Sequence, residues 1–298
     1  MNLDAGDLWT MATAACCSVA CGTLGCFLVL RRLSLLGDAI AHAILPGLAV
    51  AFLLSGTRDL TPMLAGAMAA GLLTAGLSAG LQRWGGVEPA AAIGVVFTTL
   101  FALGVVLISL VARSVDLDPG CVLYGLLEFV PLDTVAVAGM QVPRAFLWLA
   151  GTMLVNLLAI GVFFRELRLV SFDPALATAM GISVGLVHHG LLALITATAV
   201  VSFEAVGSIL VVIMLVAPGA TAHLLADRLA TMVAIAAAMA ALAAVLGCLA
   251  AIWLDTSVAG MIAVASMGIF AVATLVAPRH GVVARWCRAR KPSLQTAP

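Results

Sequence analysis

Nine apolar runs, each close to 20 residues long, decide what this chain can fold into. A helix needs about 20 mostly apolar residues to cross a bilayer. Runs that meet this requirement lie at 8–30, 36–55, 61–81, 90–112, 145–163, 182–201, 206–225, 229–253 and 258–277. Only 9% of the 298 residues are charged, against about 25% in soluble domains. The sequence therefore predicts an all-α integral membrane protein, a polytopic bundle of about nine transmembrane helices.

A further apolar stretch, 121–140, is broken by Pro131 and Asp133. We predict an interfacial or re-entrant element there rather than a tenth span, because proline removes a helix hydrogen bond. No polar segment is long enough to bury a core of its own. Residues 1–281 are therefore expected to form one transmembrane domain, and residues 282–298 a basic tail without fixed structure.

The charges between the runs predict the orientation. If the N-terminus lies outside, the inner loops hold 11 of the 14 Lys and Arg residues, as the cytoplasmic bias of positive charge requires. The C-terminal tail is then cytoplasmic. Most acidic residues fall on the outer face, among them Glu128 and Asp133. An acidic face raises the local concentration of cations, although it would also suit a partner protein with basic patches.

Several function classes find no support. The formal net charge is zero, and no basic tract with interleaved aromatics indicates nucleic-acid binding. The seven cysteines include no CxxC pair and no zinc-ligand spacing, so we expect those within the apolar runs to pack between helices. The amino end carries two Asp and no positive residue before the first run, unlike a secretory signal.

The stretch RRLSLLGDAIAHAILPG, residues 31–47, places Asp38 and His42 inside an apolar run. Residues four apart share one helix face, so the carboxylate and the imidazole point into the same space. Both are ligands for ions such as Mn²⁺, Fe²⁺ or Zn²⁺. Pro46 and Gly47 follow one turn later, where a proline weakens the helix. Ionisable residues inside a membrane are functional candidates; alternatively, Asp38 is a helix N-cap and His42 a packing contact.

A second stretch, residues 165–185, predicts a short helix outside the bilayer. Asp173 is a good N-cap, Pro174 suits the first helical position, and Gly181 suits a left-handed C-cap. The helix between them is too short to cross a bilayer. Its apolar residues, which include Leu176 and Met180, could insert into a groove on a soluble partner. They could equally lie against lipid headgroups.

The remaining histidines make weaker cases. His223 follows Pro218-Gly219 near the inner end of its run, so we predict a solvated interfacial side chain. His188 and His189 are adjacent and face different directions on a helix. They cannot form a two-histidine site alone.

Three blocks in order resemble one family over nearly the whole chain. RRLSLLGDAIAHAILPG is similar to the signature of the membrane permease subunit of bacterial zinc/manganese/iron ABC importers, the ABC-3 type. SFDPALATAMGI and SFEAVGSILVVIMLVAPGATA resemble its later blocks. GVVFTTLFALGVVLISL and VDLDPGCVLYGLLEFVPLD look closer to the manganese/iron branch. The chain departs from relatives at Ala41, often Ser, and at Leu126-Leu127, where the manganese branch often has Gly-Glu.

The resemblance implies a multi-pass permease of the bacterial cytoplasmic (inner) membrane. It implies a dimer with itself or a homologue, two cytoplasmic ABC ATPase subunits and an extracytoplasmic metal-binding protein. Asp38 and His42 would line the ion's path, with Mn²⁺, Fe²⁺ or Zn²⁺ as cargo and no resident cofactor. Residues 173–181 would dock on the ATPase. The chain has no GxxxxGK[ST] motif, which agrees with ATP hydrolysis by a separate subunit.

Three alternatives remain open on the sequence. A permease for a metal chelate, such as a siderophore or corrinoid, would favour a wider, uncharged path. For an intramembrane enzyme, such as a hydrolase, the sequence offers no HExxH motif. A proton-coupled secondary transporter would favour inverted repeats, which the sequence does not display.

Overall fold

A computed structural model describes residues 4–56, 60–111, 127–137 and 139–277. Within these ranges, nine helices are long and apolar enough to cross a membrane. They are α1 (Ala5–Leu30), α2 (Ser34–Ser55), α3 (Leu60–Gly85), α4 (Pro89–Val111), α6 (Arg144–Val162), α9 (Val184–Val206), α10 (Ser208–Leu225), α11 (Leu229–Leu254) and α12 (Val258–Val276). These bounds confirm the nine predicted spans to within a few residues.

The interrupted stretch does not form a tenth span in its described part. Residues 121–126 lie outside the description, and η1 (Leu127–Leu132) is a single 3-10 segment containing Pro131. An antiparallel pair follows, β1 (Thr134–Val137) with β2 (Met140–Pro143), in which Thr134 pairs with Pro143. We call this side of the bundle the hairpin end. The tail, 282–298, also lies outside the description.

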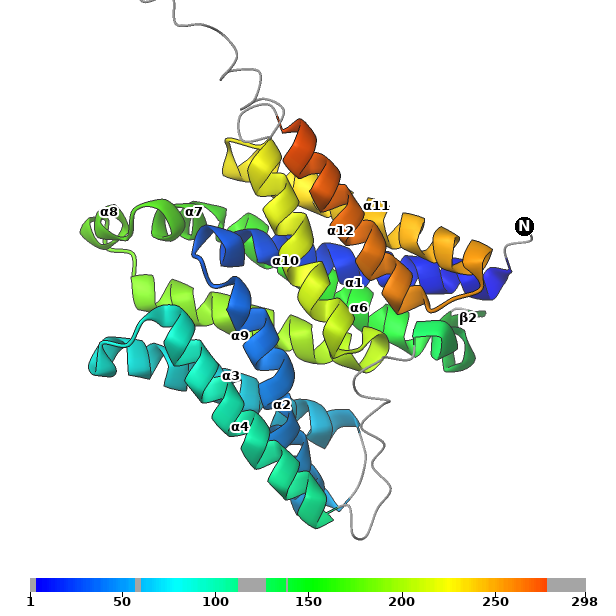
Figure 1. Ribbon diagram of the computed structural model, residues 1–298, viewed down its shortest axis with the longest axis horizontal. Coiled ribbons are helices and arrows are strands. Elements are labelled where there is room, and N and C mark those ends of the chain that lie inside the picture. The colour runs from blue at the N-terminus through cyan, green and yellow to red at the C-terminus, as the bar shows by residue number, and fades with distance from the viewer. Residues whose placement is uncertain (1–3, 57–59, 112–126, 138, 278–298) are drawn as a thin grey trace, which may run out of the picture.

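The opposite side, which we call the α8 end, carries two short helices. These are α7 (Phe164–Phe172) and α8 (Pro174–Ala179), and they connect α6 to α9. The α1–α2 turn and the α3–α4 turn lie on this same side of the bundle (Figure 1). Every second loop therefore reaches the α8 end, as expected for an up-and-down chain.

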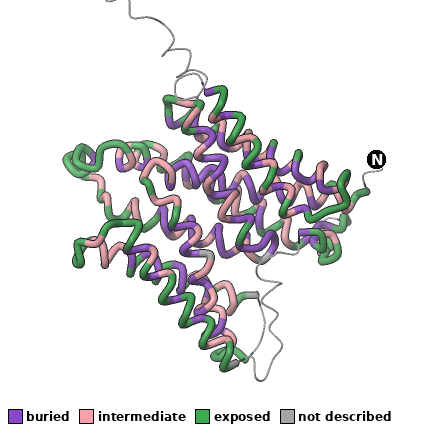
Figure 2. The backbone as a smooth tube through the Cα atoms, viewed as in Figure 1, coloured by how far each residue is buried: buried purple, intermediate pink, exposed green. Residues whose placement is uncertain are grey.

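Helix α1 forms the centre of the molecule, against α6, α10 and α11 (Figure 1). Every residue from Ala20 to Leu28 of α1 is buried, and buried backbone gathers in this central part of the molecule in Figure 2. Gly25 lies directly against the Leu215 carbonyl of α10, and Gly219 of α10 lies against the backbone of Gly25 and Cys26. Such close approach is the usual source of helix association in lipid, where small residues let backbones touch.

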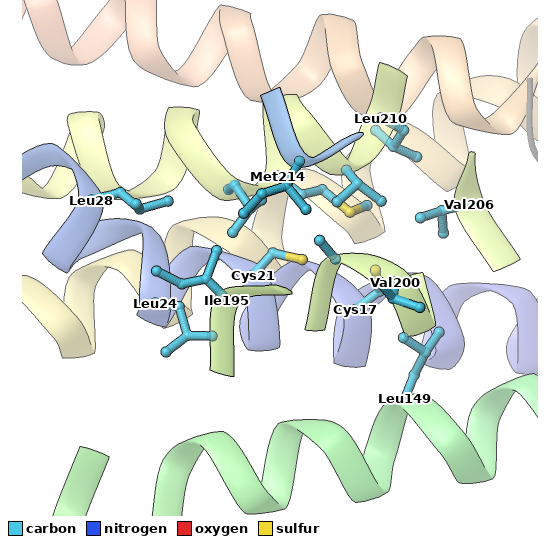
Figure 3. Packing of buried hydrophobic residues seen from close by; sticks show 14 of the residues in the cluster. Cys17, Cys21, Leu24, Leu28, Leu149, Ile195, Val200, Val206, Leu210 and Met214 are labelled. Atoms are coloured by element: carbon cyan, nitrogen blue, oxygen red, sulfur yellow. The ribbon is translucent and has the colours of Figure 1, made fainter. Parts of the chain in front are cut away.

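The interior around α1 is mostly apolar. Cys17, Cys21 and Leu24 of α1 lie among Ile195 of α9 and Met214 of α10 (Figure 3). This placement confirms the packing role predicted for the cysteines that the structure describes; Cys121 and Cys287 lie outside the description.

Helices α2, α3 and α4 form a second group that extends away from α1 (Figure 1). Gly47 of α2 and Gly66 of α3 lie each against the other's carbonyl oxygen. Helix α4 is the outer member: 53% of the apolar segment of α2 is buried, but only 33% of that of α3 and 22% of that of α4. This second group carries the Asp38–His42 pair.

Candidate functional site

Asp38 and His42 occupy the second and third turns of α2. The helix begins at Ser34, and its N-cap is Leu33, which makes no side-chain cap bond. The alternative that Asp38 caps the helix is therefore wrong. His42 lies eight residues from the helix start, roughly 12 Å along the axis, so the pair sits inside the span. His42 Nε2 and Asp38 Oδ1 are 3.4 Å apart.

The pair is accessible rather than buried in the bundle. The side chain of His42 is 31% exposed and that of Asp38 is 42% exposed. On its other side, the imidazole contacts Phe97 and Phe101 of α4, with ring centroids 5.9 and 5.6 Å away. Two aromatic contacts fix the ring plane of His42 while its Nε2 side stays open toward Asp38.

The spacing of the two ligand atoms suits one ion. A charge-assisted hydrogen bond is about 2.7–2.9 Å long, so 3.4 Å is a loose contact. Two atoms this far apart, each about 2.1 Å from a shared ion, subtend roughly 108° at that ion. Within the described residues, no group of three or more His, Cys, Asp and Glu side chains could hold a metal. One copy of the chain therefore offers two ligands at this place.

A proline contact holds the helix just beyond the pair. Pro46 lies inside α2, and a Cβ added to Gly104 of α4 would be 2.8 Å from its ring nitrogen and Cδ. Gly47, the next residue, makes the close contact with Gly66 of α3. Helix α2 is therefore clamped between two neighbours one turn after His42, at the point where proline weakens it.

The short helix at the α8 end has the predicted caps. Asp173 Oδ1 accepts a hydrogen bond from the Leu176 N–H at 2.9 Å, and Pro174 is the first helical residue. Gly181 is left-handed, with φ +79°, and Ile182 N–H donates to the Ala177 carbonyl at 3.0 Å. The left-handed Gly181 and the Ile182–Ala177 hydrogen bond form a Schellman motif at the C-terminus of α8. Leu176 and Met180 are about half exposed, whereas Ala177 is buried.

The other predicted residues stay apart from the pair. His223 is exposed at the α8 end of α10, as predicted. Asp133 lines a pocket at the hairpin end together with Arg144 and Trp148. Glu128 Oε1 accepts the Val258 N–H at 3.1 Å, so it caps the start of α12 from a distant part of the chain.

Sequence reasoning missed one cluster altogether. Arg31 Nη1 lies 3.1 Å from His188 Nδ1, and Arg31 Nε donates to Ser171 Oγ at 3.3 Å. Since a guanidinium only donates, His188 accepts through Nδ1 and is neutral. No spacing signal could reveal this contact, because 157 residues separate the two side chains.

Comparison with known proteins agrees with this arrangement. Residues 8–277 match the ABC 3 transport family. The chain is 44% identical to the manganese transport system membrane protein MntD of Bacillus subtilis, over 95% of this chain and 96% of that one. It is 39% identical to the zinc transport system membrane protein TroD of Treponema pallidum, over 90% and 73%.

A solved structure shares the fold. PsaBC from Streptococcus pneumoniae, in complex with Fab, superposes with a TM-score of 0.75 at 31% identity. The match covers 94% of this chain and 93% of that one. With nine apolar helices in the part of the chain that the structure describes, the protein is a multi-pass membrane protein, and its sequence has no ATPase motif. It belongs to the ABC 3 transport family, as a non-catalytic membrane permease subunit of the manganese branch.

Proposed function

We propose that this chain imports a divalent metal ion, with Mn²⁺ as the first candidate, past Asp38 and His42. The observation that carries the proposal is the pair itself: a carboxylate and an imidazole 3.4 Å apart, half open, inside a membrane helix. The similarity to MntD supports manganese, and the similarity to TroD keeps zinc in the comparison. Fe²⁺ shares the ligand preferences and is the third candidate.

Two ligands per chain suit a transported ion, which must be released after it binds. A transported ion needs ligands tight enough to select it and loose enough to release it. We propose that two permease copies, identical or homologous, face each other so that two such pairs supply four ligands. Oxygen and imidazole ligands suit Mn²⁺ and Zn²⁺, and no thiolate lies on this face of α2 to retain the ion.

The ends of the bundle then take different partners. Because positive residues gather at the α8 end, we propose that this end is cytoplasmic and the membrane is the bacterial inner membrane. Helix α8 presents the half-exposed Leu176 and Met180 to an ABC ATPase subunit. The hairpin end would receive the ion from an extracytoplasmic metal-binding protein.

Uptake of radioactive Mn²⁺ by the reconstituted transporter tests the proposal, with Zn²⁺ and Fe²⁺ as competitors. Asp38→Ala and His42→Ala should each lower ATP-driven uptake at least tenfold at equal assembly, because each removes one of two ligands. The matched control is His189→Ala, since this imidazole contacts the Gly185 carbonyl of its own helix at 2.6 Å. It should leave uptake unchanged.

The competition order would identify the preferred ion. Undiminished uptake in both α2 variants would refute the path, and with it a free-ion mechanism at this pair. If a metal chelate is taken up and His42→Ala does not change this uptake, the protein is a chelate importer instead.

A further inference from the structure

A cleft lined by both apolar and charged residues lies at the α8 end. Its volume is about 570 Å³. It lies between the α1–α2 turn, the α3–α4 turn and the start of α9, on the left side of Figure 1. The polar and charged side chains that line it are Arg31, Arg32, Ser78, Gln82, Glu88 and His188.

Arg31 brings a positive charge into this cleft without an acidic partner. Its two described hydrogen bonds go to His188 and Ser171, both uncharged acceptors. The remaining nitrogen, Nη2, is buried and has no partner. Burial lowers the pKa of the Arg31 guanidinium, because removing it from water disfavours its charged form. A buried cation normally has an anion beside it.

A second orphaned donor faces the same cleft. Ser78 of α3 is only 2% exposed, and its Oγ has no hydrogen-bond partner. Buried polar groups in proteins are nearly always paired. An oxygen-rich anion would satisfy the hydroxyl of Ser78 and the free nitrogen of Arg31 together.

The backbone conformation of Arg32, which follows the C-terminus of α1, is a further observation. Arg32 is in the left-handed region, with φ +57°, and Leu33 N–H donates to the Leu28 carbonyl at 2.9 Å. This Schellman position usually belongs to glycine, because a side chain there is strained. Strain kept at one residue points to a use for that side chain, and Arg32 lines the cleft.

The helix ends at the cleft favour an anion as well. The first turns of α4, near Pro89, and of α9, near Val184, line it, and helix N-termini carry partial positive charge. Glu88 opposes this field, since it lines the same cleft with a negative charge. The two arginines outweigh it.

We propose that the cleft binds a phosphate group, which Arg31, Arg32 and the Ser78 hydroxyl hold together. The phosphate can come from an anionic phospholipid of the adjoining leaflet or from phosphate in solution. Guanidinium groups bind phosphate through paired N–H donors. His188 positions Arg31 for this contact through its Nδ1 acceptor.

The test uses the complete permease–ATPase complex in detergent. Native mass spectrometry would measure how much phosphatidylglycerol and phosphatidylcholine the complex retains. In a second arm, melting temperature would be followed with added inorganic phosphate in lipid-free detergent. We expect a preference for phosphatidylglycerol, and Arg31→Gln should reduce its retention about tenfold. Glu88→Gln should increase retention, because it removes the opposing charge.

Arg32→Gly separates binding from folding. Glycine relieves the left-handed strain, so this variant should melt a few degrees higher without lipid and yet retain less phosphatidylglycerol. The control is Arg83→Gln, which removes an exposed positive charge from the last turn of α3 outside the cleft. It should retain lipid as the wild type does.

The two arms of the experiment distinguish a phospholipid from phosphate in solution. Lipid retention that depends on Arg31 or Arg32 assigns the phosphate to a phospholipid. Stabilisation by inorganic phosphate alone, lost in the same variants, assigns it to solution. The proposal is overturned if neither probe binds, or if Arg83→Gln loses as much retention as Arg32→Gly. Should Arg31→Gln fail to fold, Arg32→Gly alone decides the question.

Discussion

Helices α1 and α2 are neighbours in sequence but are packed in opposite ways. Helix α1 is enclosed, and its close contacts are backbone to backbone, as between Gly25 and Leu215. A buried amide beside it is hydrogen-bonded: Asn156 Nδ2 of α6 donates to Thr198 Oγ1 of α9 at 2.8 Å. Helix α2 instead carries a carboxylate and an imidazole, both partly exposed.

The difference follows from the cost of charge in a membrane. An uncharged amide can be buried once it is hydrogen-bonded, but a charged group needs water, an ion or a paired charge. The chain places its ionisable pair on the second group, α2, α3 and α4, where both side chains stay partly exposed. The scaffold around α1 holds that group in position. Three predictions test this division, beginning with the largest effect.

Gly25→Ala should abolish the folded bundle. The added methyl group would meet the Leu215 carbonyl, and neither backbone can move without separating α1 from α10. Overpacking costs about 1–3 kcal/mol even where side chains can shift, so a backbone clash should cost more. Yield and melting temperature in detergent measure the effect.

The control is Gly151→Ala on α6, where an added Cβ has no atom within 4 Å. It should be neutral or slightly stabilising, since alanine is the better helix former. Equal behaviour of the two variants would contradict a tightly packed centre.

Gly104→Ala should lower uptake while leaving the protein folded. Its methyl group would press on Pro46, and a displacement of α2 would move His42 from its contacts with Phe97 and Phe101. We expect uptake to fall about tenfold, given the usual cost of an ångström-scale misplacement. Uptake per assembled transporter is the measurement.

Gly94→Ala on the same helix is the matched control, because an added Cβ there meets no atom within 4 Å. If both variants transport normally, Pro46 does not set the position of the pair.

Much of the fold and part of the candidate site could be predicted from the sequence. The spans follow from apolar length, and the caps of α8 follow from Asp173, Pro174 and Gly181, because capping is local chemistry. The aromatic contacts of His42, the Arg31–His188 bond and the capping of α12 by Glu128 could not be predicted. Each depends on how distant helices pack, and small residues allow many packings.

The smallest expected effect concerns α8, which belongs to neither the α1 nor the α2 group. Helix α8 would instead connect the permease to the ATPase. Asp173→Ala removes the carboxylate that accepts the Leu176 N–H, a loss worth about 1 kcal/mol of helix stability. Part of the α8 population would then unwind, and metal-stimulated ATP hydrolysis should fall two- to fivefold. Ser183→Ala, which removes the N-cap bond of the neighbouring α9 at 3.4 Å, is the control and should have little effect.

Asp173→Asn decides which property of the aspartate matters. Asparagine is as good an N-cap as aspartate, so this variant should restore coupling if the short helix only has to be folded to dock. If Asp173→Asn is as poor as Asp173→Ala, the negative charge itself is used, through a basic partner on the ATPase. In that case the capped geometry of α8 would position a charged contact, and the apolar pair Leu176 and Met180 would contribute less than their exposure suggests.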